Sequence, residues 1–134
     1  MAQLIDSSVL IAYERSRQIP ETLTTLASHG PVAIAAITAS ELLVGLYRAD
    51  SPERRLQRER YVNAILSEIP ILPFELQAAR THAQLTSLLL ASGRLIGAND
   101  LLIAATAVAN GYAVLTANVR DFRRIPGLTV LELR

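Results

Sequence analysis

The stretch QLIDSSVLIAYER, residues 3–15, begins with a short, mainly apolar run that stops at an acidic residue. The run Gln3–Ile5, with its neighbours, has the length and composition of a buried strand that ends at Asp6. Val9–Arg15 then has the character of a helix, for which Ser7 or Ser8 can serve as the N-cap. The stretch therefore predicts a strand that passes through an aspartate directly into a helix.

The same alternation of strand and helix continues along the chain. Further strands are expected at residues 32–37, 69–74, 113–115 and 128–131, and prolines inside 69–74 favour an edge strand or a strand end. Helices are expected at residues 20–28, 41–47, 52–67, 75–91, 100–110 and 119–123. Strands that alternate with helices pair in parallel. The sequence thus predicts an α/β fold, a three-layer α/β/α sandwich with a mainly parallel central sheet, as a single domain over residues 1–134.

The composition narrows the kind of site that the chain can build. The 134 residues are 51% hydrophobic and 19% charged, apolar runs are far too short to span a bilayer, and no secretory leader pattern is present, so we expect a cytoplasmic protein. The absence of cysteine excludes disulfides and thiolate zinc sites. His29 and His82 lack a paired-ligand spacing. Any metal site must therefore be rich in oxygen ligands, which favours Mg²⁺ or Mn²⁺.

The basic residues are distributed more informatively than the net charge of +1 indicates. All 13 are arginine, and seven of them lie in two groups, at positions 54–60 and at positions 120–124. The planar guanidinium can donate two hydrogen bonds to one phosphate. For the first group, a solvated helix face is an equally good interpretation.

Three carboxylates, Asp6, Glu41 and Asp100, stand where strands or loops pass into helices. Each has a plain structural alternative: Asp6 as an N-cap, and Glu41 or Asp100 as an acidic residue in the first turn of a helix, where the helix dipole stabilises it. Thr38 or Ser40 can cap the helix of Glu41, and Asn99 that of Asp100. The functional interpretation of Asp6 rests on its place at the carboxyl end of a strand, where α/β folds hold their ligands.

Two further features surround these carboxylates in the sequence. Gly45 lies one turn beyond Glu41, and because glycine weakens a helix it indicates close approach by a partner, a substrate or a packed neighbour. Asn118 and Asp121 follow the strand at 113–115, as either helix caps or site residues.

Carboxylates that converge in one cleft repel one another unless a cation is present. With oxygen ligands alone, that cation is expected to be Mg²⁺ or Mn²⁺, one ion or two, with bound waters that it can activate. Phosphodiester hydrolysis is the reaction class that uses such a centre.

Taken in order along the chain, the motifs resemble those of the PIN domain, and more narrowly those of the VapC toxins of type II toxin–antitoxin systems. The resemblance is carried by LIDSSVLI at 4–11, TASELLVG at 38–45, GANDLLIAA at 97–105, TANVRDF at 116–122 and IPGL at 125–128. It implies an α/β/α fold, Mg²⁺- or Mn²⁺-dependent endoribonuclease activity, homodimers, and a VapB-type antitoxin that blocks the cleft and forms a hetero-oligomer with the toxin.

The resemblance also implies roles for individual residues. Asp6, Glu41 and Asp100 would be metal ligands, with Ser8 and Thr116 as hydroxyl supports. The family often has a fourth acidic residue at the position of Asn118. Either Asp121 then supplies that charge, directly or through water, or a second metal binds weakly.

One further expectation concerns RNA binding, and one alternative concerns the function. The RNA backbone is expected to contact Arg120 and Arg123. A catalytically weak or inactive PIN-like interaction module is the alternative function, and Asn118 is the residue that keeps it open.

Overall fold

The computed structural model describes residues 1–16, 19–28 and 30–133, and in this part of the chain five strands form one parallel sheet. Their order is β3-β2-β1-β4-β5. The strands are β1 (Gln3–Ile5), β2 (Val32–Ala35), β3 (Ile71–Leu72), β4 (Ala113–Thr116) and β5 (Val130–Glu132). The predicted edge strand is at the edge, but it is shortened to two residues between Pro70 and Pro73, which cannot donate to a sheet ladder.

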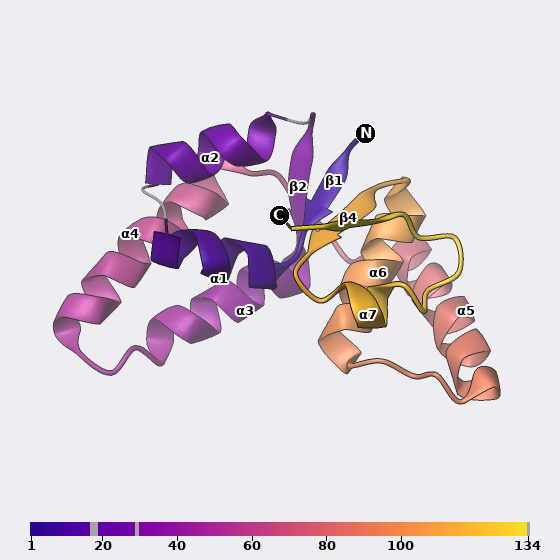
Figure 1. Ribbon diagram of the computed structural model, residues 1–134. Coiled ribbons are helices and arrows are strands. Elements are labelled where there is room, and N and C mark those ends of the chain that lie inside the picture. The colour runs from indigo at the N-terminus through magenta and orange to yellow at the C-terminus, as the bar shows by residue number, and fades with distance from the viewer. Residues whose placement is uncertain (17–18, 29, 134) are drawn as a thin grey trace.

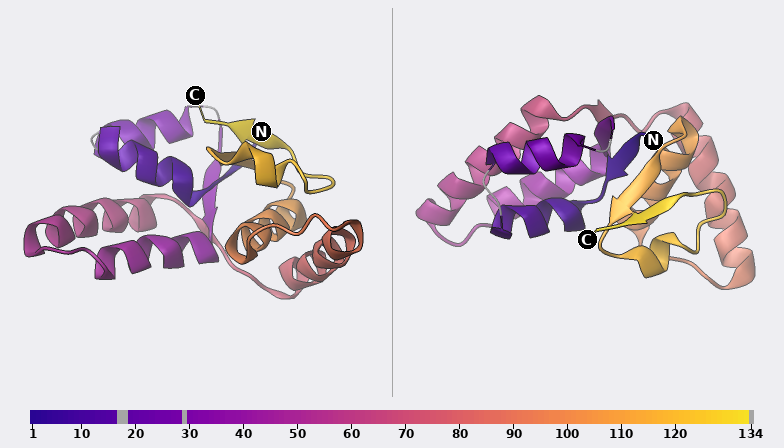
Figure 2. Two further views of the ribbon diagram at one scale, coloured as in Figure 1. Left: turned by 60° about the horizontal axis from the view of Figure 1, so that its bottom comes forward. Right: turned by 45° about the horizontal axis from the view of Figure 1, so that its top comes forward.

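Helices cover both faces of this sheet (Figure 1), which confirms the predicted three-layer class. They are α1 (Ser7–Ser16), α2 (Ile19–Ala27), α3 (Ala36–Tyr47), α4 (Pro52–Glu68), α5 (Leu76–Ser92), α6 (Ala98–Asn110) and the short α7 (Val119–Phe122). Helices α1–α4 lie on one side, and α5–α7 lie on the other; two further views show the same separation (Figure 2). In the described residues no helix has both the length and the apolar character needed to cross a membrane.

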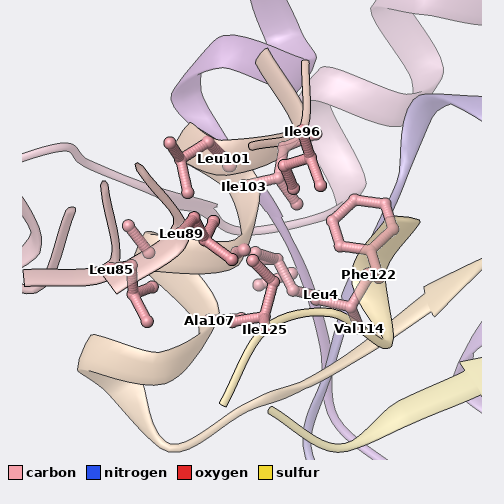
Figure 3. Close-up of a cluster of buried hydrophobic side chains, with 14 residues drawn as sticks. Leu4, Leu85, Leu89, Ile96, Leu101, Ile103, Ala107, Val114, Phe122 and Ile125 are labelled. Carbon is pink, nitrogen blue, oxygen red and sulfur yellow. The ribbon is translucent and has the colours of Figure 1, made fainter. Parts of the chain in front are cut away.

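Alternate residues of the strands pack against the helices on opposite faces of the sheet. Leu4 and Val114 point to the side of α5 and α6, where they pack with Leu89, Ile103 and Phe122 (Figure 3). Their neighbours Ile5 and Ile34 belong to the opposite core, with Val9, Leu10 and Ile65. Side chains of a strand alternate between its faces, so a sheet covered on both sides must be apolar throughout.

The strand order sets the position of the functional edge. Strand β1 lies in the middle, the chain runs outward through β2 and β3 on one side, and it returns to β4 and β5 on the other. The strand order therefore reverses between β1 and β4, and in open α/β sheets ligands bind outside the carboxyl ends of the strands at such a point. Asp6 and Thr116 stand there, at the ends of β1 and β4.

Three helix starts differ from the sequence prediction. Helix α1 begins at Ser7, so neither Ser7 nor Ser8 is its N-cap. Helix α6 begins at Ala98, directly after Gly97, so Asn99 lies inside α6 and does not cap it. Helix α3 begins at Ala36, directly behind β2, so the caps predicted at Thr38 and Ser40 are wrong. The apolar run at 32–37 crosses from strand to helix, and hydrophobicity alone does not mark that boundary.

Candidate active site

Asp6 is held in place by two hydroxyl groups from different parts of the chain. Ser8 Oγ and Thr116 Oγ1 each donate to Asp6 Oδ2 over 2.8 Å. The backbone N–H groups of Ala117 and Asn118 donate in turn to these hydroxyls, at 3.1 and 2.8 Å. Asp6 is only 4% exposed and Thr116 is fully buried. The carboxylate is therefore fixed at the strand ends by a network that uses Ser8 and Thr116 as donors and acceptors at once.

Glu41 reaches the same region from α3, but its surroundings are different. It is the sixth residue of a helix that has no acidic residue in its first turn, so the predicted first-turn position, and with it the helix-dipole explanation, is wrong. Its Oε1 atom is buried and has no hydrogen-bond partner among the described residues. Burial raises the pKa of Glu41, the charge of Asp6 raises it further, and that of Asp100 adds to this, while the side chains of Asn99 and Ser7 lower it.

Asp100 lies in the first turn of α6, opposite the segment that follows β4. The amide nitrogen Nδ2 of Asn118 donates to Asp100 Oδ2 and to Asp121 Oδ2, both over 3.3 Å. Burial raises the pKa of Asp100, followed by the charges of Asp6 and Asp121, and the hydrogen bond from Asn118 opposes them. Asn118 therefore bridges two carboxylates that would otherwise repel.

These electrostatic effects connect the predicted acidic residues into one cluster. Asp6 acts on both Glu41 and Asp100, and Asp121 acts on Asp100. Across residues 1–16, 19–28 and 30–133, however, no three acidic or histidine side chains are gathered tightly enough to hold a metal ion as they stand. The structure brings the predicted residues to one edge of the sheet without closing them around a common point.

The arginines predicted to bind RNA lie beside this cluster. Arg120 belongs to α7 and Arg123 follows it, and both are exposed. Arg124, which was not predicted as a site residue, lies closer to the acidic cluster, with Nη1 4.0 Å from Asp121 Oδ1. The short helix α7 thus presents positive charge next to the carboxylates.

Some residues of this region were missed by sequence reasoning. Ser7 and Asn99 were considered only as caps, yet their side chains act on Glu41. Their position next to the predicted ligands was the available signal. His82 packs edge-on against Phe74, with ring centroids 5.9 Å apart, and His29 lies outside the described residues.

The side chains in this region limit the chemistry that the site can perform. It offers one rigid carboxylate, two carboxylates with raised pKa values and adjacent guanidinium groups, and no thiol is available because the chain has no cysteine. An oxygen-rich anionic cluster of this kind suits a hard divalent cation, and the neighbouring arginines suit a phosphate.

The chain is similar to known proteins over nearly its whole length. Residues 4–128 match the PIN domain family. The chain is 39% identical to Ribonuclease VapC1 of Rickettsia felis over 134 residues. This alignment covers 99% of this chain and 97% of the relative.

Two solved structures have the same fold. VapBC2 from Rickettsia felis, bound to a DNA fragment from its promoter, superimposes with a TM-score of 0.87 at 26% identity, over 100% of both chains. VapBC-5 of Mycobacterium tuberculosis, from the VapBC family of toxin–antitoxin systems, superimposes with a TM-score of 0.75 at 33% identity, over 99% of this chain and 98% of that chain. The similarity extends over nearly the whole molecule in each case.

Proposed function

This chain belongs to the PIN-domain family and, within it, to the VapC ribonucleases, and from that premise we propose that it is a Mg²⁺- or Mn²⁺-dependent endoribonuclease, the toxin of a toxin–antitoxin pair. The observation that carries the proposal is the carboxylate cluster at the strand ends. Asp6 is fixed there by Ser8 and Thr116, and its charge acts on both Glu41 and Asp100. Three acidic residues from distant parts of the chain interact electrostatically at the edge of the sheet where this fold class holds its ligands.

The residues present fit a divalent cation. Glu41 has a buried oxygen without a partner, and the pKa values of Glu41 and Asp100 are raised partly by neighbouring negative charge. A cation would bind the unpaired oxygen of Glu41. It would also relieve the electrostatic repulsion that raises the pKa values of Glu41 and Asp100. Small side-chain rotations would be needed, because the carboxylates do not yet surround one point. When bound, Mg²⁺ or Mn²⁺ supplies a water of lowered pKa and a positive charge that stabilises the phosphodiester oxygens.

Each residue then has a distinct part in the site. Asp6, Glu41 and Asp100 would hold the ion, and Ser8 and Thr116 orient Asp6 through its Oδ2 atom. Asn118 holds Asp100 and Asp121 together, so Asp121 is the carboxylate available for the fourth position.

The RNA backbone would be bound beside these carboxylates. Arg120 and Arg123 are exposed on and after α7, where they can contact phosphates on the path to the cluster. RNA substrates are found in the cytoplasm, and we therefore propose that the protein acts there.

The partner of the proposed toxin is a VapB-type antitoxin. The two solved structures described above are VapBC complexes. In this chain Ile11, Val44 and Tyr47 are large apolar side chains that remain exposed on α1 and α3, and they offer a surface to a partner helix. We expect a homodimer that joins its antitoxin in a hetero-oligomer.

Replacing Asp100 by Asn tests this function. We expect RNA cleavage in Mn²⁺ to fall by at least about 10²-fold, because the site loses a charged ligand, while the melting temperature without metal stays equal or rises as repulsion is relieved. Asp50→Asn is the matched control, since Asp50 is an exposed carboxylate that pairs with Arg54 on the surface.

Equal cleavage by Asp100→Asn and the parent chain would contradict the proposal. A non-catalytic interaction module would also differ from a nuclease in its response to metal. It would show no Mn²⁺-dependent rise in melting temperature, whereas the nuclease should show one that Asp100→Asn reduces.

A further inference from the structure

A cavity of about 190 Å³ opens directly beside Glu41, between α1, α3 and α4. Ser7 and Glu41 line it, so it is continuous with the carboxylate cluster, and Leu42 and Tyr61 form an apolar part of its wall. Its volume is below the ~300–1,000 Å³ of pockets that take drug-sized ligands. The cavity therefore has the size for one flat group.

The polar wall of the cavity is an ion pair between two helices. Arg58 Nε of α4 lies 2.9 Å from Glu14 Oε2 of α1, with the two side chains 40% and 20% exposed. Arg58 Nη1 also donates to the backbone oxygen of Gly45 over 3.3 Å. The arginine is thus held by two contacts, and the pair presents a donor and an acceptor side by side.

Gly45 is the residue that gives Arg58 this position. A Cβ atom at Gly45 would lie 3.2 Å from Arg58 Nη1, so an alanine there would require the guanidinium to shift by a few tenths of an ångström. Glycine inside a helix costs about 1 kcal/mol relative to alanine. Of the close approaches that the sequence indicated at Gly45, the structure identifies a packed neighbour, and that neighbour faces the cavity.

We propose that this cavity binds one nucleobase of the RNA next to the cut, and that Arg58 and Glu14 determine which base is accepted. The inference rests on the proposed ribonuclease activity. Because Glu41 lines the cavity, an RNA strand with a phosphate at Glu41 would have an adjacent base within reach of it. The apolar wall suits a base ring, and the paired guanidinium and carboxylate can donate to and accept from its edge, as arginine and carboxylate side chains do with bases elsewhere.

The test measures cleavage of short single-stranded RNAs by the full chain in Mn²⁺, with every base varied on both sides of the cut. The parent chain should prefer certain bases at one position. Arg58→Ala and Glu14→Gln should reduce that preference, measured as a ratio of kcat/KM values, by at least about tenfold. Arg54→Ala is the matched control, because Arg54 lies one turn away in α4, is 72% exposed and pairs with Asp50.

Gly45→Ala provides a second variant that retains both charges. The new Cβ atom should shift the guanidinium by a few tenths of an ångström and should thereby weaken the base preference. Unchanged preference in both Arg58→Ala and Gly45→Ala would overturn the inference while leaving the ribonuclease intact. It would also be overturned if Arg58→Ala altered only inhibition by the antitoxin. A parent chain that cleaves no RNA would overturn the proposed function, and this inference with it.

Discussion

The two sides of the carboxylate cluster are built in opposite ways. On the side of β1 and β4, Asp6 is buried and accepts hydrogen bonds from Ser8 and Thr116. On the side of α3 and α6, Glu41 has a buried oxygen without a partner, and burial and neighbouring charges raise the pKa values of Glu41 and Asp100. On the first side the carboxylate is satisfied by hydrogen bonds, whereas on the second side Asp100 accepts a hydrogen bond from Asn118 but Glu41 Oε1 has no partner among the described residues.

This difference indicates how the site divides its work. A hydrogen-bonded carboxylate costs little to hold and keeps its position, while an unsatisfied one destabilises the protein until a cation arrives. Asp6 therefore serves as the fixed reference point of the site. Burial and neighbouring negative charge disfavour the ionised forms of Glu41 and Asp100, and a bound cation would relieve this.

The largest effect is expected from breaking the fixed side. Thr116→Val removes the hydroxyl that donates to Asp6 and accepts from the Asn118 N–H, at nearly constant volume. We expect the free energy of unfolding to fall by about 1–3 kcal/mol, as measured by denaturant titration, and cleavage to fall as well. Ser8→Ala should cost less, because Ser8 is only partly buried and Thr116 remains. Equal losses in the two variants would contradict this account.

A smaller effect, of opposite sign, is expected on the unsatisfied side. A raised pKa means that folded Glu41 binds its proton more tightly than unfolded Glu41, so its stabilising contribution is present below the ordinary value of 4.5 and is lost as pH rises through the raised value. Without metal, Glu41→Gln should therefore melt higher than the parent at pH 7, and should lose less stability between pH 5 and pH 7.

The same group should make metal binding depend on pH. The Mn²⁺-induced rise in melting temperature should grow as pH increases and Glu41 loses its proton, and Glu41→Gln should reduce that rise. Glu59→Gln, at an exposed position of α4, serves as the control and should behave as the parent chain does. A Glu41→Gln variant with the parent's pH profile, with and without Mn²⁺, would refute the proposed division.

The smallest effect is expected outside the carboxylates. Arg120→Ala and Arg123→Ala should weaken binding of RNA of every sequence to a similar degree. Each should reduce the slope of log K against log salt by about one. Filter binding to the Asp100→Asn chain at several salt concentrations measures this without cleavage. Arg80→Ala, at an exposed position of α5, is the control, and an unchanged slope for Arg120→Ala and Arg123→Ala would remove them from the RNA path.

Sequence patterns predicted the fold class well and some boundaries poorly. The apolar runs at 3–5 and 113–115 became the adjacent strands β1 and β4, because both are short, buried and followed at once by polar residues. The run at 32–37 did not reveal that the helix begins at Ala36. That boundary is set by pairing of β2 with β1 and β3, which is a contact between distant segments.

The candidate site shows the same division at the level of single residues. Glu41 was selected as an acidic residue in a first helical turn, and the structure places it in the second turn, where only tertiary contacts surround it. Asn118 was seen as either a cap or a site residue, and its amide bridges Asp100 and Asp121. Its partners could not be read from spacing, since Asp100 is 18 positions away.

The sequence by itself determined the alternation of strands and helices and, through the absence of cysteine, the restriction of any metal site to ligands other than thiolates. The tertiary structure alone decided which residues meet. Thr116 reaches Asp6 across 110 positions, and Arg58 reaches Glu14 and Gly45 from a different helix. Periodicity describes which face of an element is buried, but it contains no information on strand order. The order β3-β2-β1-β4-β5 is what places β1 beside β4 and brings their carboxyl ends together.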